Sequence, residues 1–370
     1  MTNSITIVDP WGKSGLNEYM DFYTDAILQF NPKVKVITNY YSNINPKQGL
    51  LLGKIFFKFS ENLLKPKYLR LLIRGIEYFI LQLYIALFSR TSIIHFQWFL
   101  YPAIDIYVIG ILKLRGKKVY FTAHNSKHHN RKLAKADIKI LRNVDLIFVH
   151  GKTIKNDIQS YGIDKSKVIK IPHGSKHKYI TSNKEIKPKE LKKFVFNNCL
   201  TYLFFGLINP NKGVSELLKM WDTLSKQNNS LKLVIAGKIN FKLKKEILAD
   251  RNNAIIINRF MTDEELAYLL KKSQLVLMPY INGSVSGILF TAAAYKKPVL
   301  TTDFGSISEY IINNQTSFIV KDLKEFHQKL IKLSSSSFTY FQRIGINNYN
   351  FIEETCSVKS VSTLIKKYYT

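Results

Sequence analysis

The chain has 370 residues, more than a single hydrophobic core usually organises, so two domains are expected. Its 46% hydrophobic and 13% aromatic content excludes a mostly disordered chain. Lys and Arg number 55 against 26 Asp and Glu, and the net charge of +29 favours polyanionic partners: nucleic acid, an anionic membrane face or phosphorylated substrates. Codon bias in an AT-rich genome would also raise the Lys count.

The cysteines and the N-terminus bear on location. With only Cys199 and Cys356, neither a disulfide framework nor a Cys-based zinc site is indicated, and a reducing cytosol is expected. The N-terminus lacks the basic and long apolar regions of a signal peptide. The most apolar window, Ile76 to Phe88, is shorter than the roughly 20 residues that a transmembrane helix needs. We expect a cytoplasmic protein, with peripheral attachment to the inner face of the cytoplasmic membrane left open.

The first half alternates short β-branched or aromatic runs with longer amphipathic stretches, which predicts βαβ units and a parallel sheet. The run Ile55–Phe88 departs from this rhythm and predicts two helices that mix apolar and basic residues. They would either cover a core or contact a membrane. The predicted strands are Ser4–Val8, Val34–Thr38, Ile93–Phe96, Lys118–Thr122, Leu146–Val149 and Val168–Ile171, with a helix over Leu16–Phe30.

A polar, Lys-rich stretch from Lys176 to Lys193 predicts a linker between two domains. A second alternation follows it, so two Rossmann-like domains facing across a cleft are plausible, with a ligand at the carboxyl ends of their strands. The predicted strands here are Leu200–Phe205, Leu231–Ala236, Ala254–Ile257, Leu275–Pro279, Pro298–Thr301 and Thr316–Val320. The predicted helices are Val214–Leu224, Asp263–Lys272, Ile288–Tyr295, Ile307–Ile312 and Ser357–Tyr369.

The loop after Pro279 is rich in small polar residues and leads into an Ala-rich helix that starts at about Ile288. Free amides and the dipole at a helix N-terminus make an anion site. Gly287 would let the backbone approach a phosphate, and Ser286 could cap the helix or donate to a phosphate oxygen. An ordinary turn with a serine cap explains the same pattern.

A second strand–loop–helix junction contains Lys212. This lysine precedes the helix, where the dipole does not call for a cation, so an anionic partner such as a diphosphate explains it better. A solvated lysine is the alternative.

His124 and Asn125 follow a predicted strand, at the carboxyl end where α/β active sites gather. A histidine here could hydrogen-bond a hydroxyl, act as a base near neutral pH, or be purely structural. His128 and His129 follow without an HExxH pattern, so zinc is not expected.

The first predicted loop, Asp9 to Gly15, contains Gly12 and Gly15 but neither GxGxxG nor a Walker pattern. It forms a substrate loop or a plain turn.

Together these segments resemble the retaining GT-B glycosyltransferases of glycosyltransferase family 4, over most of the chain and most closely from about Leu200 to Ile312. The order and spacing of the motifs carry the resemblance. They are Phe205-Gly206 with Lys212-Gly213, Leu233–Gly237, Leu277–Pro279, Ser286–Leu289, Pro298-Val299, Asp303–Gly305 with Glu309, Thr122–Asn125 and Ile171–Gly174.

The resemblance implies an acceptor-binding domain over 1–178 and a nucleotide-sugar-binding domain over 179–350. A helix within 351–370 is implied to cross back to the N-terminal domain. His124 is implied to be catalytic, near the transferred sugar, and Gly12, Gly15 and Asn125 to contact the acceptor or phosphate. The implied donor-binding residues are Gly206, Asn209, Lys212, Gly213, Ser286, Gly287, Ile288, Thr291 and Glu309.

The chain departs from the family in its donor segment. Many members carry two glutamates eight positions apart, and aligned through Pro298 these positions hold Gly283 and Thr291. A subset starts this segment with Ser-Gly, and the chain resembles that subset, with Asn209 where an arginine is common there. Thr291 could still hydrogen-bond a ribose hydroxyl.

The function that the resemblance implies is transfer of a sugar, of the hexosyltransferase type, from a UDP- or GDP-sugar with retention of configuration. The expected acceptor is a lipid-linked intermediate of a bacterial surface polysaccharide, such as lipopolysaccharide or capsule. No Asp-x-Asp motif is suitably placed, so neither a metal nor a cofactor besides the donor is expected. Nucleic acid is not an expected partner.

Three alternatives remain. A catalytically inactive GT-B-like binding subunit would explain the missing glutamates. A nucleic-acid-binding protein has only the basic charge in its favour. A UDP-sugar epimerase lacks its carboxylate signature.

Overall fold

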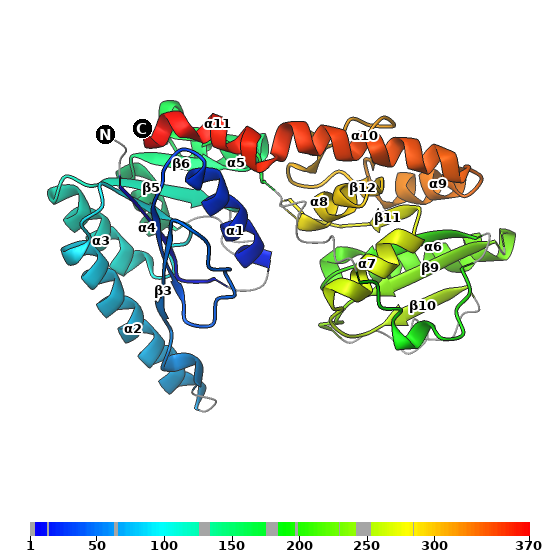
Figure 1. Cartoon of the computed structure of the whole chain (residues 1–370), viewed down its shortest axis with the longest axis horizontal. Coiled ribbons are helices and arrows are strands. Elements are labelled where there is room, and N and C mark those ends of the chain that lie inside the picture. Colours follow the sequence, from blue (N-terminus) through cyan, green and yellow to red (C-terminus); the bar gives the residue numbers. More distant parts are fainter. Residues whose placement is uncertain are drawn as a thin grey trace. The chain divides into compact units, whose positions relative to one another are not determined.

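The computed structural model describes residues 4–12, 15–62, 66–125, 134–174, 184–196, 199–228, 230–241, 253–283 and 285–370. The chain forms two compact units. Unit 1 comprises Met1–Lys176 together with Cys356–Thr370, and unit 2 comprises His177–Thr355. The C-terminal helix α11 (Val358–Tyr369), red in Figure 1, therefore belongs to unit 1 although unit 2 precedes it along the chain.

Unit 1 contains a seven-stranded parallel sheet in the order β3-β2-β1-β4-β5-β6-β7. Five of its strands are mostly buried, as expected when helices cover both faces of a parallel sheet, and the two edge strands β3 and β7 are more exposed. The strand order reverses between β1 and β4, and this switch point is where α/β folds place ligands. The strands are β1 (Ile5–Asp9), β2 (Val34–Asn39), β3 (Leu50–Phe56), β4 (Ile93–Phe96), β5 (Lys118–Ala123), β6 (Leu146–Val149) and β7 (Val168–Lys170).

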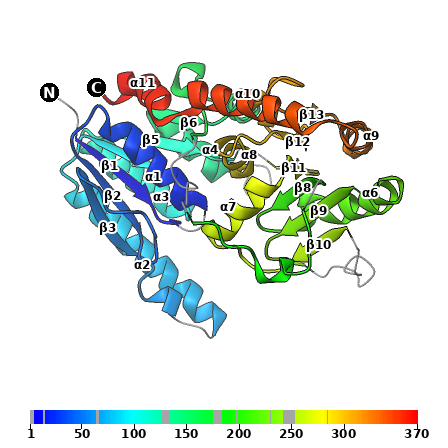
Figure 2. The same ribbon diagram turned by 45° about the vertical axis from the view of Figure 1, so that its right-hand side comes forward.

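Alternate residues of the strands feed two cores, one on each face of this sheet. Ile5 and Ile7 of β1 pack with α1 and α11, whereas Val8 packs with α2 and α3. The helices are α1 (Gly15–Leu28), α2 (Lys67–Phe88), α3 (Pro102–Leu114), α4 (Lys135–Asn143) and α5 (Lys152–Ser160). In Figures 1 and 2 the N-terminal part of α2 extends beyond the sheet.

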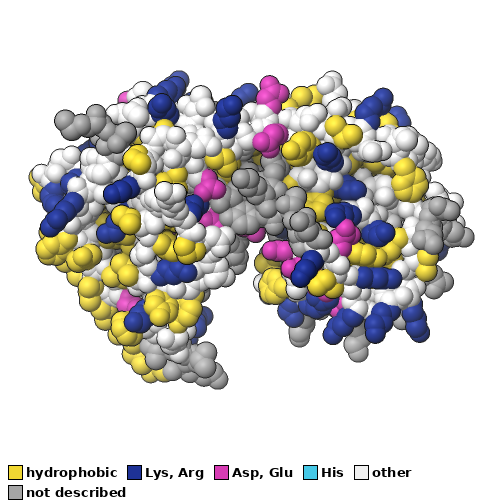
Figure 3. Space-filling view, viewed as in Figure 1, with side chains coloured by type: hydrophobic (Ala, Val, Ile, Leu, Met, Phe, Trp, Pro, Cys, Tyr) yellow, Lys and Arg dark blue, Asp and Glu magenta, His cyan; other side chains and the backbone are white. Residues whose placement is uncertain are grey.

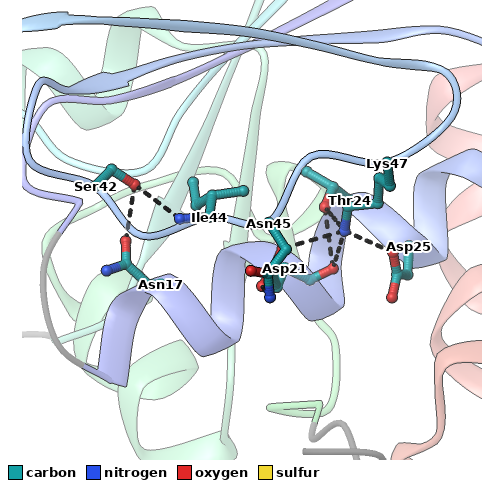
Figure 4. A network of polar contacts seen from close by, with 8 residues as sticks. All are labelled: Asn17, Asp21, Thr24, Asp25, Ser42, Ile44, Asn45 and Lys47. Carbon is teal, nitrogen blue, oxygen red and sulfur yellow. Dashed lines mark hydrogen bonds and ion pairs between the residues drawn. The ribbon is translucent and has the colours of Figure 1, made fainter.

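Polar contacts fix the loop after β2 along helix α1 (Figure 4). The Lys47 ammonium donates to the Asp21 carbonyl (2.9 Å), the Thr24 hydroxyl (2.7 Å) and the Asp25 carboxylate (2.6 Å). Further along, the Ser42 hydroxyl donates to the Asn17 amide oxygen (3.0 Å), and the Asn45 amide donates to Asp21 (3.2 Å). These bonds hold α1, and with it the first loop of the unit, against the β2–β3 side of the sheet.

Unit 2 contains a six-stranded parallel sheet in the order β10-β9-β8-β11-β12-β13, with its switch point between β8 and β11. Its strands are β8 (Leu200–Phe205), β9 (Leu231–Ala236), β10 (Ala254–Ile257), β11 (Leu275–Met278), β12 (Val299–Thr302) and β13 (Phe318–Val320). Its helices are α6 (Val214–Gln227), α7 (Asp263–Lys272), α8 (Gly287–Ala294), α9 (Leu323–Leu333) and α10 (Phe338–Cys356), the last ending at the first residue of the returning segment.

The prediction of two helices over Ile55–Phe88 is wrong. The segment completes β3, makes a 3-10 turn at Ser60–Asn62, and then forms the single helix α2. The prediction that its apolar part is too short for a membrane span is wrong as well. Among the described residues, α2 is the one helix long and apolar enough to cross a membrane. Arg74, which precedes the apolar window Ile76 to Phe88, lies within this helix.

The predicted helix over Ile307–Ile312 is only a 3-10 turn, η7 (Ile307–Tyr310). The bounds of strand β3 and of helices α3, α4, α5, α9 and α10 were not predicted.

Candidate functional site

Two loops at the carboxyl edge of the unit 2 sheet carry most of the predicted donor-binding residues. One follows β8 and ends in the 3-10 turn η5 (Pro210–Lys212), and the other joins β11 to α8. The Ile281 amide donates to the Asn211 carbonyl (2.9 Å), and the Asn211 side chain donates to the Asn282 carbonyl (3.2 Å). The structure therefore brings the two loops together at the switch point.

Gly213 is required for this close approach. Its backbone is left-handed, with φ of +66°, and a Cβ atom there would lie 1.9 Å from the Pro279 carbonyl oxygen. Gly206 is also left-handed, with φ of +103°, and a Cβ on Gly237 would lie 1.8 Å from its carbonyl oxygen. Side chains at these positions would push the loops apart.

Lys212 is the candidate cation of this site. Its Nζ lies 3.6 Å from the centroid of the Tyr280 ring, a cation–π contact. The side chain is half-buried, and this loss of solvation lowers its pKa to about 8. Within the described parts of the chain no carboxylate pairs with it. Lys212 is thus a positioned cation that an anionic ligand would stabilise.

Tyr280 was not predicted, although it directly follows the strand-ending Pro279. Its ring is buried, and its hydroxyl lies 3.5 Å from the Ser286 hydroxyl. The Phe304 ring packs on the Tyr280 ring at a centroid distance of 5.0 Å. The Tyr280 carbonyl accepts a hydrogen bond from the Thr302 hydroxyl (2.5 Å). Tyr280 therefore links Lys212 to the start of α8 and to the segment after β12.

Helix α8 begins as the anion-site prediction requires. Ser286 is its N-cap residue, but the buried Ser286 side chain makes no capping hydrogen bond. Gly287 is exposed, and a Cβ there would meet no atom within 4 Å. The backbone amides of Gly287 and Ile288 lie in the first turn, where helical partners are lacking and the dipole favours an anion. Thr291 is half-buried one turn further along.

Asn209 and Glu309 also lie in unit 2. The Asn209 carbonyl accepts from the Lys212 amide (3.0 Å) within the same loop. Glu309 is half-buried in η7, which follows the segment that places Phe304 on Tyr280. Both belong to segments that meet at the two loops.

In unit 1, His124 lies just beyond β5 in an aromatic environment. Trp98 stacks on it at a centroid distance of 4.8 Å, and Tyr19 meets it edge-on at 5.0 Å. Its Nε2 lies 3.2 Å from Oε1 of Gln97. An amide oxygen only accepts, so Nε2 carries the proton and Nδ1 keeps the lone pair. Burial, reinforced by His173 and His95, lowers the pKa of His124 to about 3.

His124 is therefore neutral near pH 7 and is a weak base. Of the predicted roles, the geometry favours a hydrogen bond accepted by Nδ1 from a hydroxyl. It disfavours removal of a proton by this histidine.

A chain of buried polar side chains continues from Gln97 to the C-terminal helix. The Gln97 amide nitrogen lies 3.4 Å from Nε2 of His95, which also lies 2.8 Å from the Thr122 hydroxyl. Nδ1 of His95 lies 2.5 Å from the Tyr369 hydroxyl, and Tyr369 lies 2.9 Å from the Tyr23 hydroxyl. We call Gln97, His95, Thr122, Tyr369 and Tyr23 the His124 chain. None of its members was predicted as a site residue, although Thr122 belongs to the Thr122–Asn125 motif.

The first loop of unit 1 is anchored on Asp9. The buried Asp9 carboxylate accepts from the Gly12 amide (3.1 Å), and burial raises its pKa to about 7. Gly12 has φ of +41°, and a Cβ there would lie 2.3 Å from the Thr38 hydroxyl oxygen. Gly15 starts α1, and the exposed Asn125 follows His124. Residues 13 and 14 of the loop lie outside the described residues.

The described residues offer no metal site. They contain no group of three or more His, Cys, Asp or Glu placed to hold a metal ion, and both cysteines are free. His128 and His129 lie outside the described residues.

Known proteins resemble this chain in sequence over about half of its length and in fold over almost all of it. Residues 186–351 match the family model "Glycosyl transferases group 1". An uncharacterized 44.6 kDa protein in the cps region of Klebsiella pneumoniae is 28% identical over 188 residues, 49% of this chain and 48% of the relative. The Staphylococcus aureus capsular polysaccharide biosynthesis glycosyltransferase CapM is 22% identical over 233 residues, 55% of this chain and 60% of the relative.

Solved structures match almost the entire chain. Anabaena HepE in complex with UDP matches with a TM-score of 0.70 at 11% identity, covering 99% of both chains. Sucrose-phosphate synthase from Thermosynechococcus elongatus matches with a TM-score of 0.74 at 13% identity, covering 99% of this chain and 98% of the other. The chain thus spans about half the length of the curated relatives that it matches. The group 1 glycosyltransferase match is confined to residues 186–351. Over almost its whole length the chain has the predicted α/β GT-B fold.

Proposed function

We propose that the protein is a glycosyltransferase that moves a sugar from a UDP- or GDP-sugar to a glycan acceptor with retention of configuration. The observation that carries this proposal is the position of Lys212. It is a half-buried cation held over the ring of Tyr280, whose hydroxyl lies 3.5 Å from that of Ser286, the N-cap residue of α8. The match of residues 186–351 to group 1 glycosyl transferases supports it, as does the likeness in fold to HepE, which was solved with UDP.

In the proposed reaction the bond between the sugar and the nucleoside diphosphate breaks, and the acceptor hydroxyl oxygen bonds to the same sugar carbon. The proton of that hydroxyl passes to the departing diphosphate. The leaving diphosphate carries growing negative charge. Lys212 and the Gly287 and Ile288 amides would stabilise that charge without reorganising, a role that otherwise falls to a metal ion. Thr291 would contact the ribose, and no cofactor besides the donor is proposed.

The proposed acceptor is a lipid-linked intermediate of a surface polysaccharide. Support comes from the two relatives, one from a cps region and one named for capsular polysaccharide biosynthesis. In unit 1, Gly12, Gly15 and Asn125 would contact this acceptor or a phosphate. His124 would hold a sugar hydroxyl through its Nδ1 atom.

A donor panel tests the proposal. Purified protein is incubated with individual UDP- and GDP-sugars and lipid-linked acceptors, and nucleotide binding, donor hydrolysis and transfer are measured. We expect one donor class to bind and react, and Lys212→Ala to weaken binding. The matched control is Lys219→Ala, at an exposed lysine of α6.

Two outcomes would count against an enzyme. Absence of binding by every nucleotide sugar, with Lys212→Ala indistinguishable from wild type, would overturn the donor site. Tight binding without hydrolysis or transfer would favour the inactive binding subunit, which Gly283 and Thr291 at the usual glutamate positions would explain.

A further inference from the structure

Helix α2 carries far more apolar surface than unit 1 covers. Tyr78, Gln82 and Ile85, spaced by four and three residues, are buried within unit 1. The other side carries large apolar side chains that are each between 43% and 64% exposed. We call these the apolar face of α2: Leu71, Leu72, Ile76, Phe79, Ile80, Tyr84, Leu87 and Phe88.

This face forms a continuous patch rather than scattered single residues. Figure 3 shows hydrophobic side chains, in yellow, gathered along the lower left edge, where Figure 1 places α2. Only 22% of the helix's most apolar stretch is buried, unlike the core helix of a soluble domain. Contiguous apolar surface of this kind marks an interaction site.

Specific bonds hold the inner side of α2 to the rest of unit 1. The buried Tyr78 hydroxyl donates to Asp105 of α3 (2.6 Å), and Arg115 donates to the Ala86 carbonyl (2.7 Å). The Glu77 carboxylate accepts from the amides of Phe59 (2.8 Å) and Ser60 (2.9 Å). Crossing a bilayer would break these bonds. The helix is therefore built to lie along the surface of its domain.

Most of the charged residues around α2 are basic. Residues 54–118 contain eleven Lys and Arg against three Asp and Glu. All three acids have partners within unit 1: Glu77 and Asp105 as above, and Glu61 through the Asn39 amide (3.1 Å). Exposed Lys58 and Lys67 stand near the N-terminal end of the helix. A partner surface that complements this region has an apolar interior and anionic groups at its boundary.

The helix also contacts the first loop of unit 1. The Arg74 guanidinium lies 4.2 Å from the centroid of the Phe57 ring and 5.7 Å from that of the exposed Trp11. Trp11 directly precedes Gly12, in the proposed acceptor loop. A partner of α2 would therefore lie close to that loop.

We propose that the apolar face of α2 inserts into an anionic lipid bilayer, with the helix parallel to the membrane plane and the basic residues at the headgroups. Helices of this type bury their apolar side about 5–10 Å into the boundary between headgroups and acyl chains. A second copy of the chain is a poorer occupant, because a two-fold contact would oppose two basic rims. The inference adds a lipid partner to the proposed function, and would bring the Gly12 loop to the surface that holds a lipid-linked acceptor.

Vesicle flotation without donor or acceptor tests this inference on the full chain. We expect binding to phosphatidylcholine vesicles that contain phosphatidylglycerol, weaker binding to phosphatidylcholine alone, and loss of the difference at high salt. The triple variant Leu72→Ser, Ile76→Ser, Ile80→Ser should lower partitioning about tenfold or more, because three inserted side chains become polar. Its exposed positions allow folding, which circular dichroism checks.

The matched control is Ile312→Ser, Ile331→Ser, Ile346→Ser, at exposed isoleucines of unit 2, and it should bind vesicles like wild type. Any of three results overturns the inference: no wild-type binding to anionic vesicles at low salt, unchanged binding by the α2 variant, or retention in vesicles after alkaline carbonate. A dimer that the α2 variant abolishes, with no vesicle binding, would assign the face to a second copy.

Thermal shifts with nucleotide sugars on the same samples separate this inference from the proposed function. Donor binding without vesicle binding would remove only the docking surface. Vesicle binding without donor binding would remove only the transferase assignment.

Discussion

Lys212 is an ammonium group in surroundings that disfavour its charge. With its pKa lowered to about 8, it is protonated below that pH and loses its charge above it. A diphosphate binds the charged form. We therefore expect donor affinity to fall as the pH rises through 8, and titration calorimetry with nucleoside diphosphate on both sides of pH 8 measures this. Lys212→Ala should bind about 10–100-fold more weakly, the loss of a hydrogen bond to a charged group, with a flatter pH profile. An equally steep profile in the variant would assign the pH dependence elsewhere.

Tyr369 lies at the far end of the His124 chain. Tyr369→Phe removes the hydroxyl beside Nδ1 of His95, so His95 and Gln97 lose part of what orients His124. We expect a several-fold rise in KM for the sugar donor, with nucleoside diphosphate affinity unchanged, at a stability cost of about 1–2 kcal/mol. The imidazole nitrogen shifts of His124 should change in the NMR spectrum.

Tyr368→Phe is the control, because Tyr368 lies next to Tyr369 but outside the chain. Unchanged His124 shifts and an unchanged KM in Tyr369→Phe would leave the His124 chain with a purely structural role.

The sequence could reveal residues near the ends of strands or the starts of helices, such as His124, Gly206 and Lys212. It could not reveal their partners. Gln97 meets His124 because β4 and β5 are neighbours, and Tyr369 arrives from a distant helix. Tyr280 could not be predicted for another reason, because an aromatic residue after a strand usually belongs to the hydrophobic core.

Arg259 joins two elements of unit 2 through two carboxylates. It donates to both oxygens of Glu190, at 2.8 and 2.9 Å, and to both oxygens of Glu265, the capping-box residue of α7, at 2.7 Å each. These hydrogen bonds lower the pKa of both glutamates. A carboxylate with a lowered pKa stabilises the fold above its unfolded pKa, near 4.5, and loses that contribution as the pH falls further.

We therefore expect the melting temperature of unit 2 to fall below about pH 4.5, and Arg259→Met to remove part of this dependence. Differential scanning calorimetry across this pH range measures both. Arg142→Met, at a surface arginine of unit 1, serves as the control. A melting profile in Arg259→Met that parallels wild type would show that other carboxylates control acid unfolding.

Elements with strong local patterns were predictable, and those shaped by their neighbours were not. Buried strands such as β8 and β9 read as continuous apolar runs. Strand β3 is a half-exposed edge strand interrupted by Gly53, so its pattern is weak. Helix α10 contains Gly345, whose Cβ would lie 1.9 Å from the Lys296 carbonyl oxygen, so close packing rather than helix propensity explains that glycine.

For the whole molecule, the two-unit α/β architecture was predictable from length and from the alternation of strands and helices. The return of the chain to unit 1 was implied only by the family resemblance, and the structure confirms it. No local sequence pattern indicates which of the two sheets a terminal amphipathic helix covers.

Helix α11 completes the core of unit 1. Its residues Val361, Ile365 and Tyr369 are fully buried beside Tyr23 and Ile27 of α1. Deleting residues 357–370 should therefore destabilise unit 1 while unit 2 stays folded. Limited proteolysis should then cleave unit 1 and spare a fragment of unit 2.

The point variant Leu364→Ser, at an exposed position of α11, should behave as wild type. Equal protease resistance of unit 1 with and without residues 357–370 would contradict the role given to α11.

The divided sequence of unit 1 sets an order of completion during translation. At 5–20 residues per second, the ribosome needs roughly 10–40 s to pass from the end of the first segment to the start of the returning one. Throughout that interval Tyr23 and Ile27 lack the helix that covers them, while every residue of unit 2 is being supplied in one piece. The half that is made first is therefore the half that is finished last, and the nascent chain carries an open apolar face until α11 emerges.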